Sequence, residues 1–277
     1  MNRVLSLQDI SCFGKCSLTL ALPLISAMGV ECVPIPTALL STHTGGLGDV
    51  EFVDLTDNIM PVAEHLKRLK INFDVIHIGY LGSAAQIDIA KKIIDIFKHE
   101  GTTVLLDPVM GDNGALYRRF DMEYVKKMRS LAAHADYVLP NLTEAALLTD
   151  VAYTGETAAE DHIGRLFETA SARFPSRFIV TGVCSGDDMI GAVSRHSDPV
   201  QNISYMTKCH NASFHGTGDV FAGVMAGALA KGFKPEAAVC LSVEFTAAVI
   251  KNTILAKTDE RFGVRFEDCL SLLTRLP

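Results

Sequence analysis

Short apolar runs alternate with longer stretches of helical periodicity along the chain, and this alternation restricts the possible folds most strongly. The runs are rich in β-branched residues and end at Gly, Pro, Asn or Asp, as buried parallel strands do. We expect such strands at residues 4–7, 31–35, 74–78, 103–106, 137–139 and 177–181, and later edge or antiparallel strands at 189–194 and 203–207. Helices are expected at 17–28, 62–69, 84–99, 122–133, 143–148, 156–173, 219–231 and 235–254. The short connections predict an α/β fold, a three-layer α/β/α sandwich around a mostly parallel sheet.

Composition and charge exclude several classes of function. The 277 residues are 48% hydrophobic and 21% charged, which is typical of a soluble globular protein. A net charge of −7 argues against a nucleic-acid partner, because such partners are bound mainly by neutralising phosphates.

Cysteine usage and the N-terminal segment indicate the compartment. The seven cysteines are odd in number and scattered, which favours a reduced cytoplasm over a disulfide framework. Cys12 and Cys16 lack the clustered Cys/His spacing of structural zinc. The first apolar run ends at Gln8 and Asp9, too early for a signal peptide, and no stretch reaches the roughly 18 uninterrupted apolar residues of a membrane span. We therefore expect a cytoplasmic protein with no membrane partner.

Residues that directly follow the expected strands are the first candidates for a site, because open parallel sheets bind ligands at the carboxyl ends of their strands. These positions hold Gln8, Asp9, Gly79, Tyr80, Asp107, Pro108, Asn141, Glu144, Thr181 and Gly182. Such a set of acids and glycines suits a metal-bound phosphate chain.

The most specific motif is His-Gly-Thr-Gly-Asp at residues 215–219, directly before a helical stretch. Two glycines let consecutive backbone N–H groups converge at a helix N-terminus, which binds anions. Gly216, Thr217 and Gly218 would stabilise charge on a transferring phosphoryl group, while Asp219 would accept the proton of an attacking hydroxyl. A simple helix cap is the alternative interpretation of Asp219. Small residues at 222, 223, 226, 227 and 230 predict close packing of this helix.

The chain has no Gly-x-x-x-x-Gly-Lys-Ser/Thr sequence, so its phosphate site is not a P-loop. The Gly-Thr-Gly-Asp motif before a small-residue helix instead resembles the anion-hole signature of the ribokinase superfamily. Three further stretches resemble its pyridoxal kinase branch: Asp-Pro-Val-Met-Gly-Asp at 107–112, Ser-Thr-His-Thr-Gly at 41–45 and Pro-Asn-Leu-Thr-Glu at 140–144. Their order agrees with that branch, and the resemblance extends from residue 4 to residue 253. It implies a single ribokinase-like kinase domain over residues 1–277 with no separate lid domain.

The resemblance also implies roles for individual residues. The catalytic set comprises the base Asp219 and an anion hole of Gly216, Thr217 and Gly218. The ATP-binding set comprises Asp107, Asn141, Glu144, Thr181 and Tyr117. Asp107 and Glu144 would also organise Mg²⁺, partly through water. The substrate-binding set comprises Asp9, His43, Thr44 and Asp219.

The implied activity is ATP-dependent phosphorylation of the 5′-hydroxymethyl group of pyridoxal, pyridoxine or pyridoxamine. Segment 112–120, which contains Tyr117, would be a flap that closes over ATP and excludes water. A monovalent cation is a further candidate cofactor. The resemblance also implies a homodimer.

Pyridoxal kinases commonly carry Gln-Ser-His after the first strand, whereas this chain has Gln-Asp-Ile at residues 8–10, with Asp9 in place of the serine. An Asp here resembles the Ser-Asp-x-Ser-Gly pattern of hydroxymethylpyrimidine kinases of thiamine synthesis, so phosphorylation of hydroxymethylpyrimidine or its phosphate is the alternative function. Asp219, where those enzymes often have Cys, and the His-Thr-Gly loop favour vitamin B6. We expect the Asp9 charge to face a ring nitrogen, a phenolic group or an amine.

Two further hypotheses are less favoured. A sugar or nucleoside kinase of the same superfamily usually carries an additional β lid domain, for which this chain is too short. A non-catalytic B6-binding protein would share the fold, but an intact Asp219 argues against it.

Overall fold

A seven-stranded sheet, in the order β3-β2-β1-β4-β5-β8-β9, forms the centre of the computed structural model, which describes residues 1–155, 159–186, 188–210, 212 and 214–276. The strands are β1 (Arg3–Ser11), β2 (Glu31–Leu40), β3 (Phe52–Asp54), β4 (Val75–Ile78), β5 (Thr103–Leu106), β8 (Tyr137–Val138) and β9 (Arg177–Phe178). Neighbouring strands are parallel except β3, which pairs antiparallel with β2 at the edge. The expected mostly parallel sheet is therefore confirmed, and β3 is an addition to it.

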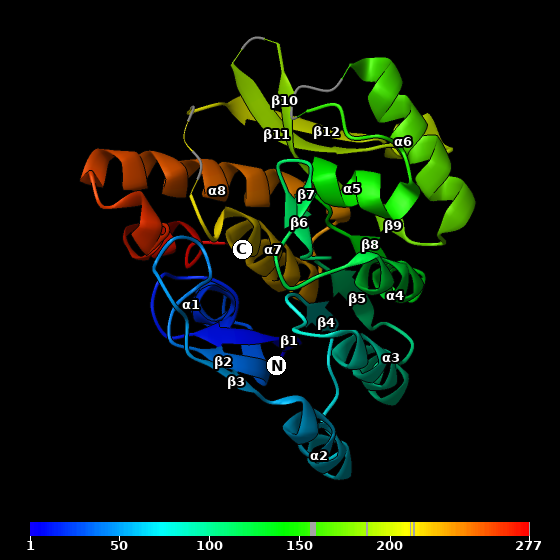
Figure 1. The fold of residues 1–277 in the computed structure, drawn as a ribbon, viewed down its shortest axis with the longest axis vertical. Helices are drawn as coiled ribbons and strands as arrows, with labels where there is room; N and C mark the ends of the chain where they lie inside the picture. The colour runs from blue at the N-terminus through cyan, green and yellow to red at the C-terminus, as the bar shows by residue number, and fades with distance from the viewer. Residues whose placement is uncertain (156–158, 187, 211, 213, 277) are drawn as a thin grey trace.

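Helices cover both faces of this sheet (Figure 1). One face carries α1 (Leu18–Ala27), α7 (Thr217–Ala230) and α8 (Pro235–Ala256), and the other carries α2 (Thr56–Arg68), α3 (Ala84–Phe97), α4 (Met122–Ala132), α5 (Leu142–Thr149) and α6 (Glu160–Arg173). Successive side chains of a strand point to opposite faces. Leu5 and Leu7 accordingly pack into the α2–α6 core, whereas Val4 packs into the core with α1, α7 and α8. This arrangement confirms the expected three-layer architecture.

Two smaller sheets lie beyond the main one. β10 (Val180–Ser185), β11 (Met189–Ser194) and β12 (Ile203–Lys208) form an antiparallel sheet at the top of Figure 1, and β6 (Gly111–Asp112) pairs with β7 (Ala115–Leu116) in a short hairpin. The strand expected at 177–181 is thus divided at Ile179 between two sheets. Backbone hydrogen bonds still run from the Ile179 N–H to the Val138 carbonyl oxygen and from the Thr181 N–H to the Pro140 carbonyl oxygen, while Val180 and Thr181 also pair with β11.

The first turn of α7 reaches the strand ends because α7 packs closely on α1. A Cβ on Gly223 would lie 3.4 Å from Leu24 Cδ1, and one on Gly227 would clash with the Met28 side chain. Larger side chains here would push the helices apart, so the predicted close packing is confirmed.

Helix α8 is long and apolar enough to cross a membrane by length and composition alone, with a mean hydropathy of 1.5 in its most apolar stretch. In this fold it packs against α7 and β12 and buries Val239, Val243 and Phe245 in the core. The core helix of a soluble protein has the same composition.

Candidate active site

A cavity of 680 Å³ opens at the carboxyl ends of the parallel strands. It is lined by every residue to which the resemblance gave a role, namely Asp9, His43, Thr44, Asp107, Tyr117, Asn141, Glu144, Thr181, Gly216, Thr217, Gly218 and Asp219. Of the other candidates at strand ends, Tyr80 and Gly182 line it, whereas Gln8, Gly79 and Pro108 do not. These residues come from positions up to 210 apart in the chain (219 − 9) and meet because parallel strands end at one edge of the sheet.

The anion-hole segment forms the first turn of α7. Gly216 adopts φ +89°, and a Cβ at this position would lie 2.5 Å from the Lys15 carbonyl oxygen, so only glycine fits. Nothing lies within 4 Å of a Cβ on Gly218, which leaves its backbone open to the cavity. The N–H groups of the first turn have no intrahelical partner and are available to an anion.

Asp219 does not cap α7, since within the described part of the chain its carboxylate receives no hydrogen bond from the first turn of this helix. Its carboxylate instead accepts a hydrogen bond from the backbone N–H of Ser17, in the loop before α1. Burial, together with the charge of Asp9, raises the pKa of Asp219 to about 7, and the Ser17 hydrogen bond opposes this rise only in part. A carboxylate with such a pKa is a suitable general base near neutral pH.

Asp9 lies within β1 and not after it, because β1 continues to Ser11. The pairing of β1 with β2 shifts register between Gln8 and Ile10, and this irregularity leaves Asp9 without a β2 partner. Its carboxylate accepts hydrogen bonds from the Ser11 hydroxyl at 3.0 Å and from the Ser17 side chain. Asp9 and Asp219 are therefore neighbouring acids that share the support of Ser17.

Ser17 is a residue that the sequence did not reveal as functional. A serine before a helix usually caps it, yet the Ser17 side chain makes no cap hydrogen bond to α1 in the described structure. Its backbone has φ 50° and ψ −126°, a sparsely populated region for a residue with a Cβ. Such backbone strain occurs where surrounding contacts impose it, often at active sites.

Asp107 and Glu144 form a second pair of buried acids. Burial is the main reason that the pKa of Glu144 rises to about 8, and it also raises the pKa of Asp107, to which the nearby Glu144 and Asp219 add. The two Glu144 oxygens accept the backbone N–H groups of Met110 and Asn141, each at 3.0 Å, and the latter belongs to a capping box. No hydrogen bond reaches the Asp107 carboxylate from the part of the protein that the structure describes. Asp107 therefore has the more available oxygens for a cation.

Asp107 and Glu144 fit a Mg²⁺ site in which the protein and a bound nucleotide together supply the ligands. The described residues contain no group of three or more His, Cys, Asp or Glu side chains that would enclose a metal by themselves. Mg²⁺ usually binds one or two carboxylates and completes its octahedron with phosphate oxygens and water. Asp107 would supply the direct ligand in such a scheme, and Glu144 would contribute charge or a water-mediated contact.

The β6–β7 hairpin covers one side of the cavity and is anchored to the start of α5. Asn141 Nδ2 donates to the Gly111 carbonyl oxygen at 2.9 Å, and the Gly114 N–H donates to Thr143 Oγ1 at 2.8 Å. Tyr117 follows the hairpin and is 44% exposed at the cavity wall. This placement agrees with the expected flap, and it gives Asn141 a structural task besides any contact with ATP.

His43 is buried, and the protein occupies both of its ring nitrogens. Nδ1 accepts the N–H of Gly45 at 3.0 Å, while Nε2 donates to the Arg261 carbonyl oxygen at 2.7 Å. The ring also lies against His215, with centroids 4.5 Å apart. His43 thus connects the substrate loop at 41–45 to the C-terminal turn and to the anion-hole segment. Both His43 and Thr44 line the cavity, but His43 is buried and Thr44 is exposed.

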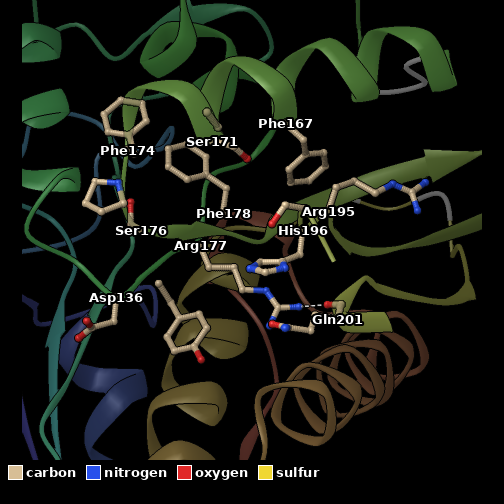
Figure 2. Close-up of a pocket in the computed structure, with 14 residues that line it drawn as sticks. Asp136, Phe167, Ser171, Phe174, Ser176, Arg177, Phe178, Arg195, His196 and Gln201 are labelled. Carbon is tan, nitrogen blue, oxygen red and sulfur yellow. Dashed lines mark hydrogen bonds between the residues drawn. The ribbon is translucent and has the colours of Figure 1, made fainter. Parts of the chain in front are cut away.

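A second cavity, of 470 Å³, lies at the opposite end of the strands, beside the first residues of β8 and β9 (Figure 2). Arg177 donates to the Gln201 carbonyl oxygen, as the dashed line in Figure 2 shows, and Arg195 pairs with Glu160. Its guanidinium groups therefore already have partners, and it contains none of the predicted site residues. The larger cavity is the candidate active site.

Comparisons with known proteins place this chain among kinases. Residues 22–261 match the family model described as phosphomethylpyrimidine kinase. The chain belongs to this family. The family member with a solved structure from Bacteroides thetaiotaomicron, a candidate phosphomethylpyrimidine kinase crystallised with pyridoxal, is 34% identical, with 98% of this chain and 95% of that chain covered and a TM-score of 0.91.

This chain is also similar to two pyridoxal kinases. The crystal structure of pyridoxal kinase from Lactobacillus plantarum is 32% identical, covers 99% of this chain and 96% of its own, and has a TM-score of 0.89. The pyridoxal kinase of Dictyostelium discoideum is 27% identical over 247 residues, which are 81% of this chain and 77% of that protein. The chain therefore lies in the pyridoxal kinase-like branch of the ribokinase superfamily.

Proposed function

We propose that this protein transfers the γ-phosphoryl group of ATP to the 5′-hydroxymethyl group of a vitamin B6 alcohol, namely pyridoxal, pyridoxine or pyridoxamine. One observation carries the proposal. A half-buried carboxylate with a pKa of about 7, Asp219, stands beside the open backbone of Gly216–Gly218 in a cavity that also holds Asp107 and Glu144. The similarity to pyridoxal kinases and to a structure with pyridoxal supports the choice of acceptor.

Each of these residues has a separate role in the phosphoryl transfer. The acceptor hydroxyl oxygen forms a bond to the γ-phosphorus as the bond from phosphorus to the bridging oxygen breaks, and ADP leaves with that electron pair. Asp219 takes the hydroxyl proton, and the first-turn N–H groups of α7 stabilise charge on the transferring group. Bound Mg²⁺, held by Asp107 with Glu144 nearby, would neutralise phosphate charge.

Phosphorylation of hydroxymethylpyrimidine or its phosphate is the second candidate, favoured by the description of the matching family model. Asp9 supports it as well, since an acid in this place resembles that class of kinases. Cytoplasmic location and a homodimer complete the proposal, and light scattering of the purified protein measures the oligomeric state.

A coupled assay of ADP release with the three B6 alcohols and hydroxymethylpyrimidine tests the activity. We expect turnover that requires an acceptor, and a fall in kcat by about 10²–10⁴-fold in Asp219→Asn, the usual contribution of a general base. Calorimetric binding of pyridoxal should be preserved in this variant. Binding without turnover in the wild type would show a carrier protein, and a near-normal kcat in Asp219→Asn would remove Asp219 as the base.

A further inference from the structure

Two histidines that lie against each other in the large cavity differ in what their ring nitrogens bind. The rings of His43 and His215 are 4.5 Å apart, at an interplanar angle of 32°. Both nitrogens of His43 form hydrogen bonds within the protein. His215 is exposed and lines the cavity, and its ring forms no hydrogen bond to any residue that the structure describes. The protein therefore holds this ring in place and leaves its nitrogens open to a ligand.

The position of the His215 ring depends on Gly45, in the substrate loop. A Cβ on Gly45 would lie 2.2 Å from both Cε1 and Nε2 of His215, so any side chain there would displace the ring. The backbone of Gly45 does not itself require glycine, because its φ is not positive. The missing side chain at this position therefore makes room for the imidazole.

His215 directly precedes the anion hole. Gly216 is the N-cap of α7, so the side chain one position earlier stands at the mouth of the helix whose first-turn N–H groups are free to bind an anion. Asp112, in the β6–β7 hairpin, is near enough for its charge to act on the ring. The ring thus lies where the anion-hole segment, the substrate loop and the hairpin meet. A phosphoryl group that passes from ATP to the acceptor must cross this region.

Side-chain cations are scarce around the cavity. Its described lining has five carboxylates but a single lysine, Lys208, and no arginine. Burial and the neighbouring His43 hold the pKa of His215 below its ordinary value of 6.5, so near neutral pH the ring is uncharged and has one N–H to donate. A positive charge beside Asp219 would lower the pKa of that carboxylate and weaken it as a base. A neutral donor avoids this conflict.

We propose that His215 is a catalytic residue whose ring N–H donates a hydrogen bond to a non-bridging oxygen of the γ-phosphoryl group during its transfer. This role rests on the proposed kinase function and adds a side-chain donor to the backbone donors of the anion hole. His215 keeps its proton throughout, since Asp219 takes the proton of the acceptor hydroxyl. A donor placed for the group in transit stabilises the transition state more than bound ATP, so its loss should lower kcat more than it raises KM.

His215→Phe tests the role because phenylalanine keeps a ring against His43 and removes the donor. In the ADP-release assay with the B6 alcohols, kcat should fall about 10- to 100-fold with much smaller changes in KM, as expected for one hydrogen bond to a charged oxygen. His215→Asn and His215→Gln carry an amide donor near one or the other ring nitrogen, and at least one of them should recover most of the lost rate. His65→Phe, at an exposed histidine outside the cavity, is the matched control.

Gly45→Ala displaces the ring without changing it. This variant should lower kcat by itself, because its methyl group would occupy the place of the imidazole. In a His215→Ala background the methyl group has no ring to meet, so Gly45→Ala should have little further effect there. The same fall in kcat in both backgrounds would show that Gly45 acts independently of the ring, against the proposed role.

A near-normal kcat in folded His215→Phe, verified by thermal unfolding, would overturn the proposal, because packing of a ring would then be sufficient. Absence of acceptor-dependent ADP release in the wild type would instead refute the proposed function. Calorimetric titration with orthovanadate, in the presence of Mg²⁺ and ADP, tests His215 in either case. Binding about 10-fold weaker in His215→Phe than in the wild type supports the donor, and equal binding overturns it.

Discussion

Asp219 controls the pH dependence expected of this enzyme. Only its deprotonated form accepts a proton, and its pKa is raised to about 7, so kcat/KM should rise with pH through that value. Because the charge of Asp9 contributes to the rise, the acidic limb of the profile should move to lower pH in Asp9→Asn. Rates with pyridoxine between pH 5.5 and 8.5 measure both effects. A flat profile would show that Asp219 is not the base.

His43 holds the substrate loop in place, because both of its ring nitrogens form hydrogen bonds within the protein. His43→Ala removes the hydrogen bonds to Gly45 and Arg261 and should lower the free energy of unfolding by about 2 kcal/mol. We expect a several-fold higher KM for the acceptor and an unchanged KM for ATP, since the loop at 41–45 carries residues of the substrate-binding set and none of the ATP-binding set. His99→Ala, at an exposed position, is the control. Equal changes in both KM values would contradict a role confined to this loop.

The β6–β7 hairpin is the element whose position should decide how well water is excluded. Thr143→Val removes the hydroxyl that accepts the Gly114 N–H and preserves side-chain volume, at a cost of about 1 kcal/mol. A less firmly held flap should raise ADP release without acceptor relative to release with it. The ratio of the two rates measures this directly, and Thr102→Val, at a buried threonine away from the cavity, is a control for loss of a hydroxyl. An unchanged ratio would show that this anchor does not control closure.

The buried acids should make the whole molecule less stable as pH rises when Mg²⁺ is absent. Folding raises the pKa of Glu144 from its ordinary value of 4.5 to about 8, so the folded state holds a proton that the unfolded chain has released. Stability from this proton is lost as pH rises to about 8. Burial lowers the pKa of His77 to about 4, so its contribution makes the protein more stable as pH rises. This opposite effect is confined to pH values below the ordinary histidine pKa of 6.5.

Between pH 6.5 and 8 we therefore expect a loss of roughly 2 kcal/mol in EDTA, seen as a Tm about 5 °C lower. Mg²⁺ should reduce this loss of stability with rising pH, because it favours the charged carboxylates. The variant Asp107→Asn should reduce the same loss in the absence of metal. Scanning calorimetry with and without Mg²⁺ checks the prediction. A Tm that stays constant or rises over this range in EDTA would contradict it.

The sequence by itself determined the layers and the location of the site. Strand positions followed from apolar runs at 4–7, 74–78 and 103–106, which must be buried on both faces, and strand ends point to one edge of a parallel sheet. Gly216 and Asp219 were recognisable because an anion site at a helix N-terminus needs that local backbone. Short elements such as β3 and the division at Ile179 were missed, since tertiary pairing decides them.

Only the tertiary structure decided how the site residues act on one another. Ser17 supports both Asp9 and Asp219, and His43 bonds to Arg261, 218 positions away in the chain. Such contacts depend on a register shift in β1, a strained loop and the close packing of α7 on α1, and no local residue pattern encodes them. Asp9 shows the division most clearly: its charge is evident in the sequence, but only the folded cavity shows that, among the described residues, hydroxyl groups and no positive side chain surround it.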